Sequence, residues 1–532
     1  MTLVALGGTL LAIALRVFAA IAAGPLWRDE AGSASTASVA SFTEFLGRQH
    51  QDSFPLLWQL LLRVWTTVLW DGGDVAIRAL GLIVAVLLLP ALWWTCRAFG
   101  TVPLASLLFA GVAPTFVVWA GIQNRAYGLG VVLLALLIGA MWRLVEAPSA
   151  RRVAFATLVA MLAVHTSYHN PVMLVALVAA AAAVGLARRS WAVVVSAAGV
   201  GIVAALSMSI YAGVLGRTRE LAKMVYAQPT LASVVQGVQS ALAPGGGFVV
   251  YAFALLALGA CVLGLSAALR AARWHAPAPG DDATAAVTFA AAAVIFAAVG
   301  QVIFLLYLRF LVQPWYYVGV VLVIAVAIDV VVQRGIAAGR LRDAVLASIA
   351  VLLVLSALPA ASAIDRRQSN LDLVAAYLKA NARPGDLIVV YPWHYGVSFS
   401  RYHDGAVPFM TIPAVEGHDY HRFDQLEQLM RDPELIKPGF RRIYQTLQAG
   451  NGVWVVGRPT TEVPAEFPVP SPPRDDDPSS WRDGLYTAVA GLQLGWVLQQ
   501  ASPQALPVPP LTETRISDYE DASITLYSVR PR

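Results

Sequence analysis

Long apolar stretches dominate the pattern of hydrophobic and polar positions along this chain. They lie at about 3–24, 75–96, 102–120, 126–142, 153–167, 171–187, 191–214, 248–269, 285–307, 314–332 and 344–363. A helix needs about 20 consecutive apolar residues to cross the hydrocarbon core of a bilayer. Only helices and closed barrels satisfy every backbone polar group in that environment. The pattern therefore predicts a polytopic α-helical membrane protein with about 11 transmembrane helices.

Two stretches near the amino terminus are interpreted separately. Residues 1–24 lack a basic segment ahead of the apolar run, and Arg16 lies inside it, so they predict an uncleaved first helix and not a secretory signal. The segment "FPLLWQLLLRVWTTVLW" (54–70) is apolar but short and contains Arg63. It favours an interfacial or half-embedded helix over a full span.

The pattern changes after about residue 364, where charges, prolines and turn residues become frequent. An amphipathic helix is expected in "LDLVAAYLKANARPGD", ended by the Pro-Gly pair. Short buried strands are expected at 387–392, 452–457 and 523–529. The sequence thus predicts a multi-span module over 1–363 and a C-terminal α/β domain over 364–532. No GxGxxG follows the first of these strands and no Walker A motif occurs, which excludes the familiar nucleotide-binding sites.

Composition supports the membrane interpretation. Of the 532 residues, 58% are hydrophobic and only 13% are charged, and the mean hydropathy is +0.65. The formal net charge of +5 is small, and basic clusters interleaved with aromatic residues are absent, so no nucleic-acid partner is expected. Cys96 and Cys261 both lie in or beside apolar runs, so we interpret them as buried, inert thiols.

Arginine positions predict the orientation of the spans. With a cytoplasmic amino terminus, the inner connections carry most of the arginines, whereas the short outer connections hold little more than Arg125 and Arg309. The inner set is Arg97, Arg143, Arg151, Arg152, Arg188, Arg189, Arg270, Arg273, Arg334, Arg340 and Arg342. The long first outer loop (about 25–74) and the domain 364–532 are then extracytoplasmic.

Two adjacent carboxylates follow the first apolar run, in "AGPLWRDEAGSAS" (23–35). Asp29 and Glu30 are interpreted either as caps or solvated charges of an interfacial helix, or as catalytic groups. Ionisable residues beside the bilayer tend to have a function. A carboxylate there is well placed to take a proton from a hydroxyl as a general base.

Six segments follow one another along residues 1–365: "LWRDEA", "DSFPLLWQLLLRVW", "DVAIRALGLIVAVLLLPALWWTCRAFG", "WAGIQNRAYGLGVVLLAL", "VHTSYHNPVMLV" and "YLRFLVQPWYYVGVVLV". In this order they resemble the GT-C membrane glycosyltransferases, and more closely the branch that includes protein O-mannosyltransferases and lipid A aminoarabinose transferases. The chain departs from the family at Asn124, where an acidic residue is usual, which leaves more weight on Asp29 and Glu30.

The resemblance implies an inverting transfer from a polyprenyl-phosphate-sugar donor at the extracytoplasmic face of a bacterial plasma membrane. The acceptor would be a glycolipid, a polysaccharide or a protein. Asp29 would be the base, with Glu30 beside it. Arg125 and Arg309, and more weakly Arg28, are candidates to bind the donor phosphate, since arginine suits bidentate phosphate contact. The alternative for Arg125 and Arg309 is snorkelling to the headgroups.

The remaining candidates for substrate binding follow from the same motifs: Arg78, Tyr127, His165, Tyr168, His169 and Asn170. The two histidines are spaced i, i+4, but zinc would need further ligands, and no cofactor or metal is indicated. They are expected to bind acceptor or sugar, or to be structural. Trp315, Tyr316 and Tyr317 are expected in a headgroup belt.

In the C-terminal domain, "YPWHYGVSFSRYHDG" follows a predicted strand and gathers His394, Arg401, His403 and Asp404. It predicts either acceptor recognition or an ordinary surface helix. Two rival functions remain for the whole chain. A transporter or flippase would favour polar residues at mid-span and two related halves, neither of which is evident. A receptor or assembly protein would not need the ordered motifs of the membrane part.

Overall fold

The computed structural model describes residues 1–49, 54–69, 72–213, 223–225, 227–273, 282–310, 312–460, 462–501 and 503–529. It divides into two compact units. The helical unit comprises Met1–Ile21, Phe54–Gly213 and Gln228–Asp365. The sheet unit comprises Ala22–Ser53, Val214–Ala227 and Arg366–Arg532. Residues 22–53, expected in the first loop of the membrane module, therefore group with the C-terminal residues.

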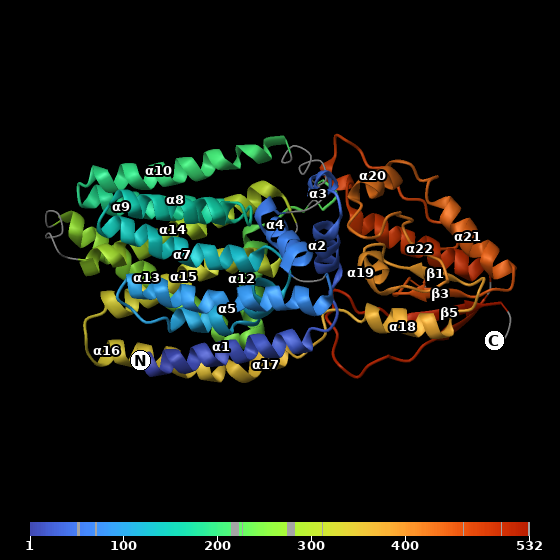
Figure 1. Ribbon diagram of the computed structural model, residues 1–532, viewed down its shortest axis with the longest axis horizontal. Coiled ribbons are helices and arrows are strands. Elements are labelled where there is room, and N and C mark those ends of the chain that lie inside the picture. Colours follow the sequence, from blue (N-terminus) through green and yellow to red (C-terminus); the bar gives the residue numbers. More distant parts are fainter. Residues whose placement is uncertain are drawn as a thin grey trace. The chain divides into compact units, whose positions relative to one another are not determined.

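The helical unit is built from long apolar helices that lie side by side (Figure 1). They are α1 (Thr2–Ala22), α5 (Asp74–Ala98), α7 (Tyr127–Glu146), α8 (Ala150–Val164), α9 (Asn170–Ala187), α10 (Trp191–Ser207), α13 (Gly247–Arg273), α14 (Asp282–Leu308), α15 (Val318–Val330), α16 (Arg340–Leu355) and α17 (Ala357–Ile364). Shorter helices are α4 (Leu56–Val64), α6 (Pro114–Val117) and α12 (Leu231–Leu242).

Nine helical segments in the described part of the chain are long and apolar enough to cross a membrane. The predicted class, a polytopic helical membrane protein with a C-terminal α/β part, is confirmed, whereas the count of 11 is not. Two predicted spans differ. Helix α8 has only 15 residues. The stretch 102–120 is broken into a π-helical turn (Leu107–Val112), α6 and a second π-helical turn (Val118–Ile122), because Pro114 cannot continue a helix that precedes it.

Two ionisable side chains inside the helical unit hold this broken stretch. The fully buried guanidinium of Arg16 donates from Nε to the carbonyl of Ala85 at 3.1 Å and from Nη1 to that of Gly111. The buried carboxylate of Asp329 accepts from the backbone N–H groups of Leu104, Ala105 and Ser106 at 2.8–3.0 Å. Intramembrane charges often mark transport pathways. Here both satisfy backbone groups that the broken helix leaves without partners.

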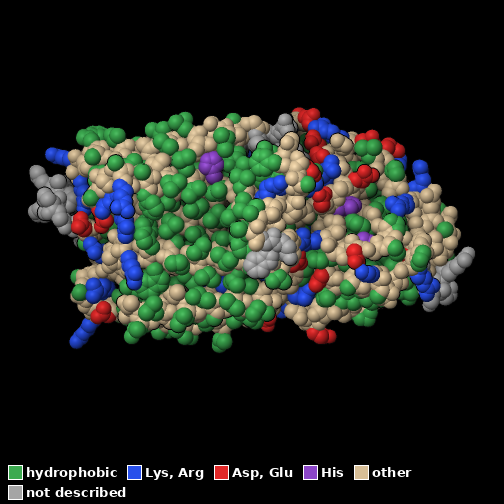
Figure 2. Space-filling view, in the orientation of Figure 1, with side chains coloured by type: hydrophobic (Ala, Val, Ile, Leu, Met, Phe, Trp, Pro, Cys, Tyr) green, Lys and Arg blue, Asp and Glu red, His purple; other side chains and the backbone are tan. Residues whose placement is uncertain are grey.

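The outward face of the helical unit is apolar. Leu3, Ile21, Tyr251 and Leu358 are 74–83% exposed. Figure 2 shows hydrophobic side chains over this unit, with Lys and Arg gathered at the end where α16 begins. Arg188 belongs to the arginines that are predicted to be cytoplasmic. Its guanidinium pairs with the carboxylate of Asp282, at the start of α14, at 3.2 Å. An apolar girdle bounded by a basic end is what a bilayer requires. The chain is a multi-pass membrane protein.

The sheet unit contains a five-stranded mixed sheet in the order β2-β1-β3-β5-β4. Its strands are β1 (Leu387–Val390), β2 (Phe409–Thr411), β3 (Val453–Val456), β4 (Gln504–Pro507) and β5 (Ile524–Ser528). Strands β2, β1 and β3 are parallel, whereas β5 is antiparallel to β3 and β4. The three predicted strands correspond to β1, β3 and β5. The sequence did not predict β2 and β4, which are short edge strands.

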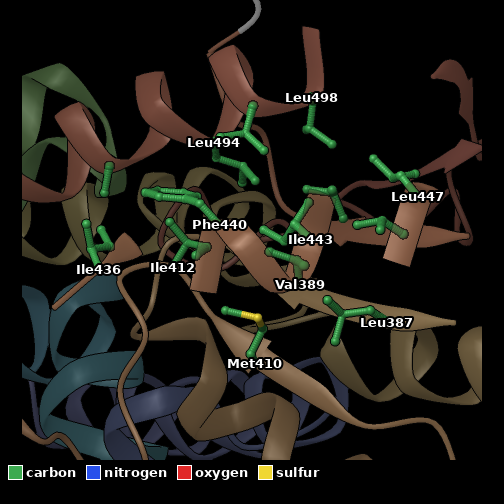
Figure 3. Packing of buried hydrophobic residues seen from close by; sticks show 14 residues of the cluster. Leu387, Val389, Met410, Ile412, Ile436, Phe440, Ile443, Leu447, Leu494 and Leu498 are labelled. Carbon is green, nitrogen blue, oxygen red and sulfur yellow. The ribbon is translucent and has the colours of Figure 1, made fainter. Parts of the chain in front are cut away.

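Both faces of the sheet are covered, which explains the continuous apolar sequences "LIVV" and "VWVV". On one face Leu387 and Val389 pack with α21 (Lys437–Gln448) and α22 (Asp483–Ala501), as Figure 3 shows. On the other face Ile388 and Val390 pack with α18 (Leu371–Asn381) and α19 (Tyr395–Tyr402). Alternate side chains of one strand thus build two separate cores.

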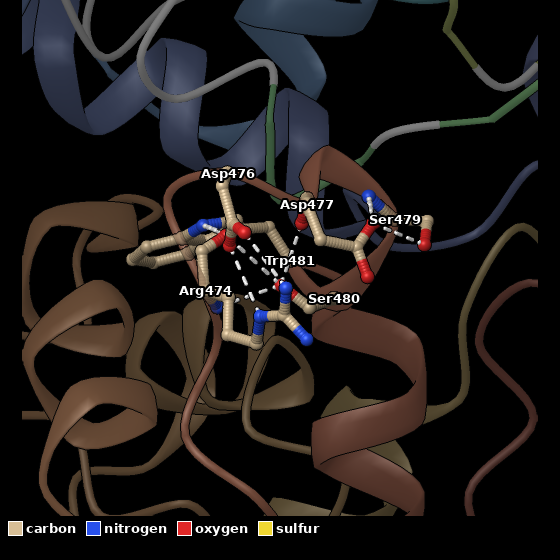
Figure 4. A network of polar contacts seen from close by, with 6 residues as sticks. All are labelled: Arg474, Asp476, Asp477, Ser479, Ser480 and Trp481. Atoms are coloured by element: carbon tan, nitrogen blue, oxygen red, sulfur yellow. Dashed lines mark hydrogen bonds and ion pairs between the residues drawn. The ribbon is translucent and has the colours of Figure 1, made fainter.

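Local polar contacts organise the proline-rich connection ahead of α22 (Figure 4). Arg474 binds Asp476 through Nε at 3.0 Å and Nη2 at 2.7 Å. The carboxylate of Asp477 accepts from the backbone N–H and the hydroxyl of Ser479. The indole N–H of Trp481 donates to the carbonyl of Arg474 at 3.2 Å. These bonds give partners to backbone groups of the loop, such as the N–H of Ser479 and the carbonyl of Arg474. They thereby hold the segment directly before α22.

Candidate functional site

The first candidate site lies in the sheet unit, at the start of α2 (Arg28–Ser38). The hydroxyl of Tyr402 in α19 accepts from the backbone N–H of Leu26 at 2.7 Å, which fixes the chain just before α2. The carboxylate of Glu30 accepts from the backbone N–H of Trp27 at 3.3 Å and is fully buried. This bond is the reciprocal half of a capping box. Glu30 therefore satisfies the amino terminus of its own helix.

The neighbouring Asp29 has a different environment. Its side chain is 28% exposed, and its Oδ1 lies 3.8 Å from Nε of Arg28 and 3.8 Å from Nε2 of His421. Arg28 is itself held in place, because Nη1 donates to the carbonyl of Tyr519 at 2.7 Å and its guanidinium lies 5.1 Å from the ring centre of Trp27. The accessible carboxylate of the pair thus lies between a guanidinium and an imidazole.

His421 was not among the residues predicted from sequence. Its ring is stacked on Phe423 with 5.8 Å between centroids, and Trp393 meets it edge-on at 5.9 Å. Two aromatic side chains therefore hold the imidazole at the carboxylate of Asp29. The sequence "HDYHRF" (418–423) contains no pattern that connects it with the first loop.

Buried titratable groups surround Arg28. Burial raises the pKa of Glu520 to about 8, opposed in part by Arg28, and the Ser398 hydroxyl lies 2.9 Å from both carboxylate oxygens. Burial also lowers the pKa of His394 well below its ordinary 6.5, and Arg28 and His421 act in the same direction. Both groups are then uncharged at neutral pH. Asp483 also interacts with the charge of Arg28, which opposes the burial that raises the pKa of this carboxyl to about 6.

The second candidate site lies in the helical unit and is a small pocket. It encloses about 240 Å³ of space free of atoms, part of it open to the outside. Three predicted residues, Tyr127, His169 and Asn170, line it together with Trp315 and Tyr316. The ring of His169 lies 4.8 Å from that of Tyr316. Its buried Nδ1 has no hydrogen-bond partner within the described residues.

Asn170 and His165 both have structural partners. The amide of Asn170 donates to the carbonyl of Ala163 at 2.9 Å and to Thr166 Oγ1 at 3.1 Å, at the start of α9. His165 uses both ring nitrogens, Nδ1 with the hydroxyl of Tyr211 at 2.7 Å and Nε2 with Ser207 Oγ at 3.1 Å. These bonds join the turn 165–170 to the end of α10.

Tyr168 lies beside the same turn, since its ring meets Tyr211 edge-on at 6.3 Å. Arg125 lies 4.6 Å from the ring centre of Phe54, and Phe54 meets Tyr127 edge-on at 4.8 Å. Arg125 thus contacts Phe54, and Phe54 contacts Tyr127, which lines the pocket.

The other two predicted arginines have different surroundings. Arg78 is 8% exposed within α5. Arg309 directly follows α14, is exposed, and has a φ of 51°, a left-handed conformation that is uncommon for residues other than glycine. The next residue, Phe310, lies 6.3 Å from the ring of Tyr316, which lines the pocket.

The polar loop of the C-terminal domain separates into distinct environments. His394 is buried, and burial together with the charge of Arg28 lowers its pKa. His403 instead stacks on Phe399 at 4.9 Å, and its Nε2 is 2.9 Å from the carbonyl of Val407. Asp404 pairs with Lys379 at 2.7 Å, and both side chains are largely exposed. Arg401 belongs to the last turn of α19.

A metal centre is not evident in the described residues, because no three His, Cys, Asp or Glu side chains gather closely enough to hold an ion. Cys96 is buried beside Ser106 at 3.9 Å, as expected for an inert thiol, and Cys261 is partly buried in α13.

Comparison with known proteins gave matches only among solved structures. No protein-family model matches the sequence, and neither does any curated protein. The apo form of the Archaeoglobus fulgidus oligosaccharyltransferase has a TM-score of 0.48 and 12% identity over 85% of this chain and 69% of that one. Its complex with zinc and sulfate has a TM-score of 0.47 and 12% identity over 85% of this chain and 67% of that one. The archaeal oligosaccharyltransferase AglB with an inhibitory peptide and a dolichol-phosphate has a TM-score of 0.47, 11% identity, and coverages of 85% and 69%.

Proposed function

We propose that this protein is a membrane glycosyltransferase that moves a sugar from a polyprenyl-phosphate donor to an extracytoplasmic acceptor with inversion. The observation that carries the proposal is the environment of Asp29. It is a partly exposed carboxylate that follows the first apolar helix directly and lies 3.8 Å from both Arg28 and His421. A general base must be ionised and accessible to its substrate. Asp29 meets the second requirement, because its side chain is 28% exposed, whereas Glu30 is fully buried.

In the proposed reaction, Asp29 accepts the proton of an acceptor hydroxyl. The acceptor oxygen forms a bond to the anomeric carbon, and the bond from that carbon to the phosphate oxygen breaks. The lipid phosphate leaves with the electron pair, so the carbon is attacked from the opposite side and its configuration inverts. The leaving phosphate needs cations to stabilise its charge. Arg125, Arg309 and Arg28 are the proposed sources.

The remaining residues of the proposal bind substrate or support the residues that do. Tyr127, His169 and Asn170 are assigned to the pocket of the helical unit, where Trp315 and Tyr316 add aromatic surface. Arg78, His165 and Tyr168 are assigned to the support of this region. The acceptor class stays open among glycolipid, polysaccharide and protein. No metal is part of the proposal.

The cellular setting is also a proposal. Arginines in the inner connections favour a cytoplasmic amino terminus, which places residues 25–74 and 364–532 on the extracytoplasmic side. The donor lipid of a bacterial plasma membrane would present its sugar at that surface. Both parts of the chain that flank Asp29 in the sheet unit would then face the same compartment.

The test uses purified full-length protein in detergent with a panel of synthetic undecaprenyl-phosphate sugars and envelope extract as acceptor. We expect release of undecaprenyl phosphate together with transfer of labelled sugar to one extract component. The envelope of cells that lack the protein should miss one sugar on the same glycan. Reconstituted protein that carries a labelled lipid across vesicles without cleaving it would instead identify a transporter.

A further inference from the structure

An isolated parallel bridge in the sheet unit joins Arg367 to Ile516. The backbone N–H of Arg367 donates to the carbonyl of Arg515, and that of Ser517 donates to the carbonyl of Arg367, both at 2.9 Å. In parallel pairing, the residues that precede a bridged pair also lie opposite each other. Because side chains alternate between faces, Arg366 and Arg515 therefore project on the same side, opposite to Arg367.

Two guanidinium groups directly opposite each other repel, and such like-charge pairs destabilise a strand pairing. The described residues offer them no ion pair and no side-chain hydrogen bond. Arg366 is half-buried with its Nε fully buried, whereas Arg515 is exposed. Burial and the charge of Arg515 lower the pKa of Arg366, which Asp518 and Tyr519 oppose only in part. Asp518 supplies one negative charge beside Arg366, so it can balance only one of the two guanidinium groups.

A third polar group adds to this side of the bridge. Ser517 lies two residues beyond Arg515 and is therefore on the same side of its segment. Its side chain is 1% exposed, and its hydroxyl has no hydrogen-bond partner among the described residues. A buried hydroxyl without a partner costs free energy. An anion at this place would satisfy the hydroxyl and neutralise the two arginines.

Other arginines of the same unit show what an ordinary structural contact looks like. Arg367 binds both carboxylate oxygens of Asp372 at 2.6 and 2.8 Å. Arg458 pairs with Asp521 at 3.3 Å, and Arg474 binds Asp476 in the network of Figure 4. Unlike these three arginines, Arg366 and Arg515 form no ion pair with a carboxylate among the described residues, so their guanidinium groups can bind an anion.

The position of the pair along the chain indicates where the anion comes from. Arg366 follows the end of α17 at Ile364 by two residues, and α17 closes the apolar segment Arg340–Ile364. The backbone N–H of Gln368 donates to the carbonyl of Ala23, the residue after α1, at 2.7 Å. Two apolar helices thus end beside this segment. Lipid headgroups lie where apolar helices end.

We propose that Arg366, Arg515 and Ser517 form a binding site for the phosphate group of a membrane lipid. Guanidinium groups bind phosphate oxygens through paired hydrogen bonds, and the serine hydroxyl supplies a further donor. This site uses other residues than the donor-phosphate residues proposed above, although Arg28 and Arg366 both act on Tyr519, and it does not depend on the glycosyltransferase function. Two lipids carry suitable chemistry, an anionic phospholipid and a polyprenyl phosphate.

The experiment measures lipid binding to the purified full-length protein in neutral detergent. The probes are phosphatidylglycerol, undecaprenyl phosphate and inorganic phosphate. Arg366→Gln/Arg515→Gln is compared with Arg458→Gln/Arg474→Gln, which removes the same charge from paired arginines. We expect the first variant to bind lipid phosphate on the order of 5-fold more weakly per arginine, and the control to bind within about 2-fold of wild type.

The probes distinguish the two lipids. A loss confined to phosphatidylglycerol identifies a bulk-lipid site, and a loss confined to undecaprenyl phosphate identifies a carrier-lipid site; either supports the proposal. Equal losses in test and control variants would contradict it, and so would competition by inorganic phosphate as strong as that by lipid. The exposed single variant Arg515→Gln, with about 5-fold weaker binding expected, serves if the double variant does not fold.

Discussion

The different environments of Asp29 and Glu30 make their conservative substitutions separable. Asp29→Asn keeps the shape of the side chain and removes the base. A positioned general base contributes about 10²–10⁴-fold in rate, which corresponds to about 2.7–5.4 kcal/mol of activation free energy. Since Asp29 is partly exposed and its ion pairs with Arg28 and His421 are long, at 3.8 Å, we expect the free energy of unfolding to change by less than about 1 kcal/mol.

Glu30→Gln should behave in the opposite way. Glutamine can still accept from the backbone N–H of Trp27, as in other capping boxes, so turnover should stay close to that of wild type. Glu30→Ala removes the cap and should lower the free energy of unfolding by about 1 kcal/mol, with a much smaller effect on rate than Asp29→Asn. We therefore expect substitution of Asp29 to affect mainly the rate, and substitution of Glu30 to affect mainly the stability.

The assay follows transfer of labelled sugar from a synthetic polyprenyl-phosphate donor by each purified variant, with thermal unfolding measured on the same samples. Asp365→Asn is the matched control, because this exposed carboxylate directly follows α17. The reasoning fails if Asp29→Asn turns over at the wild-type rate while folding normally. It also fails if Glu30→Gln, and not Asp29→Asn, abolishes turnover, since the base would then be the buried carboxylate.

Three further predictions concern other parts of the molecule. Arg309→Lys should lower turnover about ten- to a hundred-fold if Arg309 binds the donor phosphate through its fork, because lysine offers only a point charge; wild-type kinetics would favour snorkelling. A periplasm-dependent reporter fused after Arg532 should be active, and activity of a cytoplasm-dependent reporter there would overturn the proposed orientation. Glu520 is protonated in the folded protein up to a pKa of about 8, whereas its ordinary value is 4.5, so folding takes up a proton between these values. Stability should therefore decrease as pH rises through that window, by at most about 1.4 kcal/mol per pH unit, and Glu520→Gln should flatten the dependence measured by thermal unfolding.

Residue pattern alone predicts much of the architecture, because burial in lipid and burial in a two-sided sheet both leave long apolar runs. The apolar segments correspond to helices of the helical unit, and "LIVV" and "VWVV" became central strands. The broken stretch 102–122 was harder to predict. Its irregular backbone depends on Arg16 and on Asp329, which is 223 residues from Ser106 in sequence.

The candidate site shows the same limit. A motif could point to Asp29, but not to the histidine beside it, because nothing local in the sequence connects "WRDE" with "HDYHRF". The roles of Asp29 and Glu30 were likewise indistinguishable from their order alone. They separate only when the helix start is known, since a capping box buries one of the two carboxylates.

The grouping of residues 22–53 with the C-terminal residues has a consequence for biosynthesis. Arg28 and its partner Tyr519 are 491 residues apart in sequence. At a synthesis rate of about 5–20 residues per second, α2 leaves the ribosome roughly 25–100 s before that partner does. For the first part of this interval, until α19 (Tyr395–Tyr402) has been made, the buried carboxylate of Glu30 and the buried small residues of α2 have no α19 to pack against. The start of α2 therefore gains its partners Tyr402 and Tyr519 only late in synthesis, so slowed translation of the final third should lower the yield of folded protein.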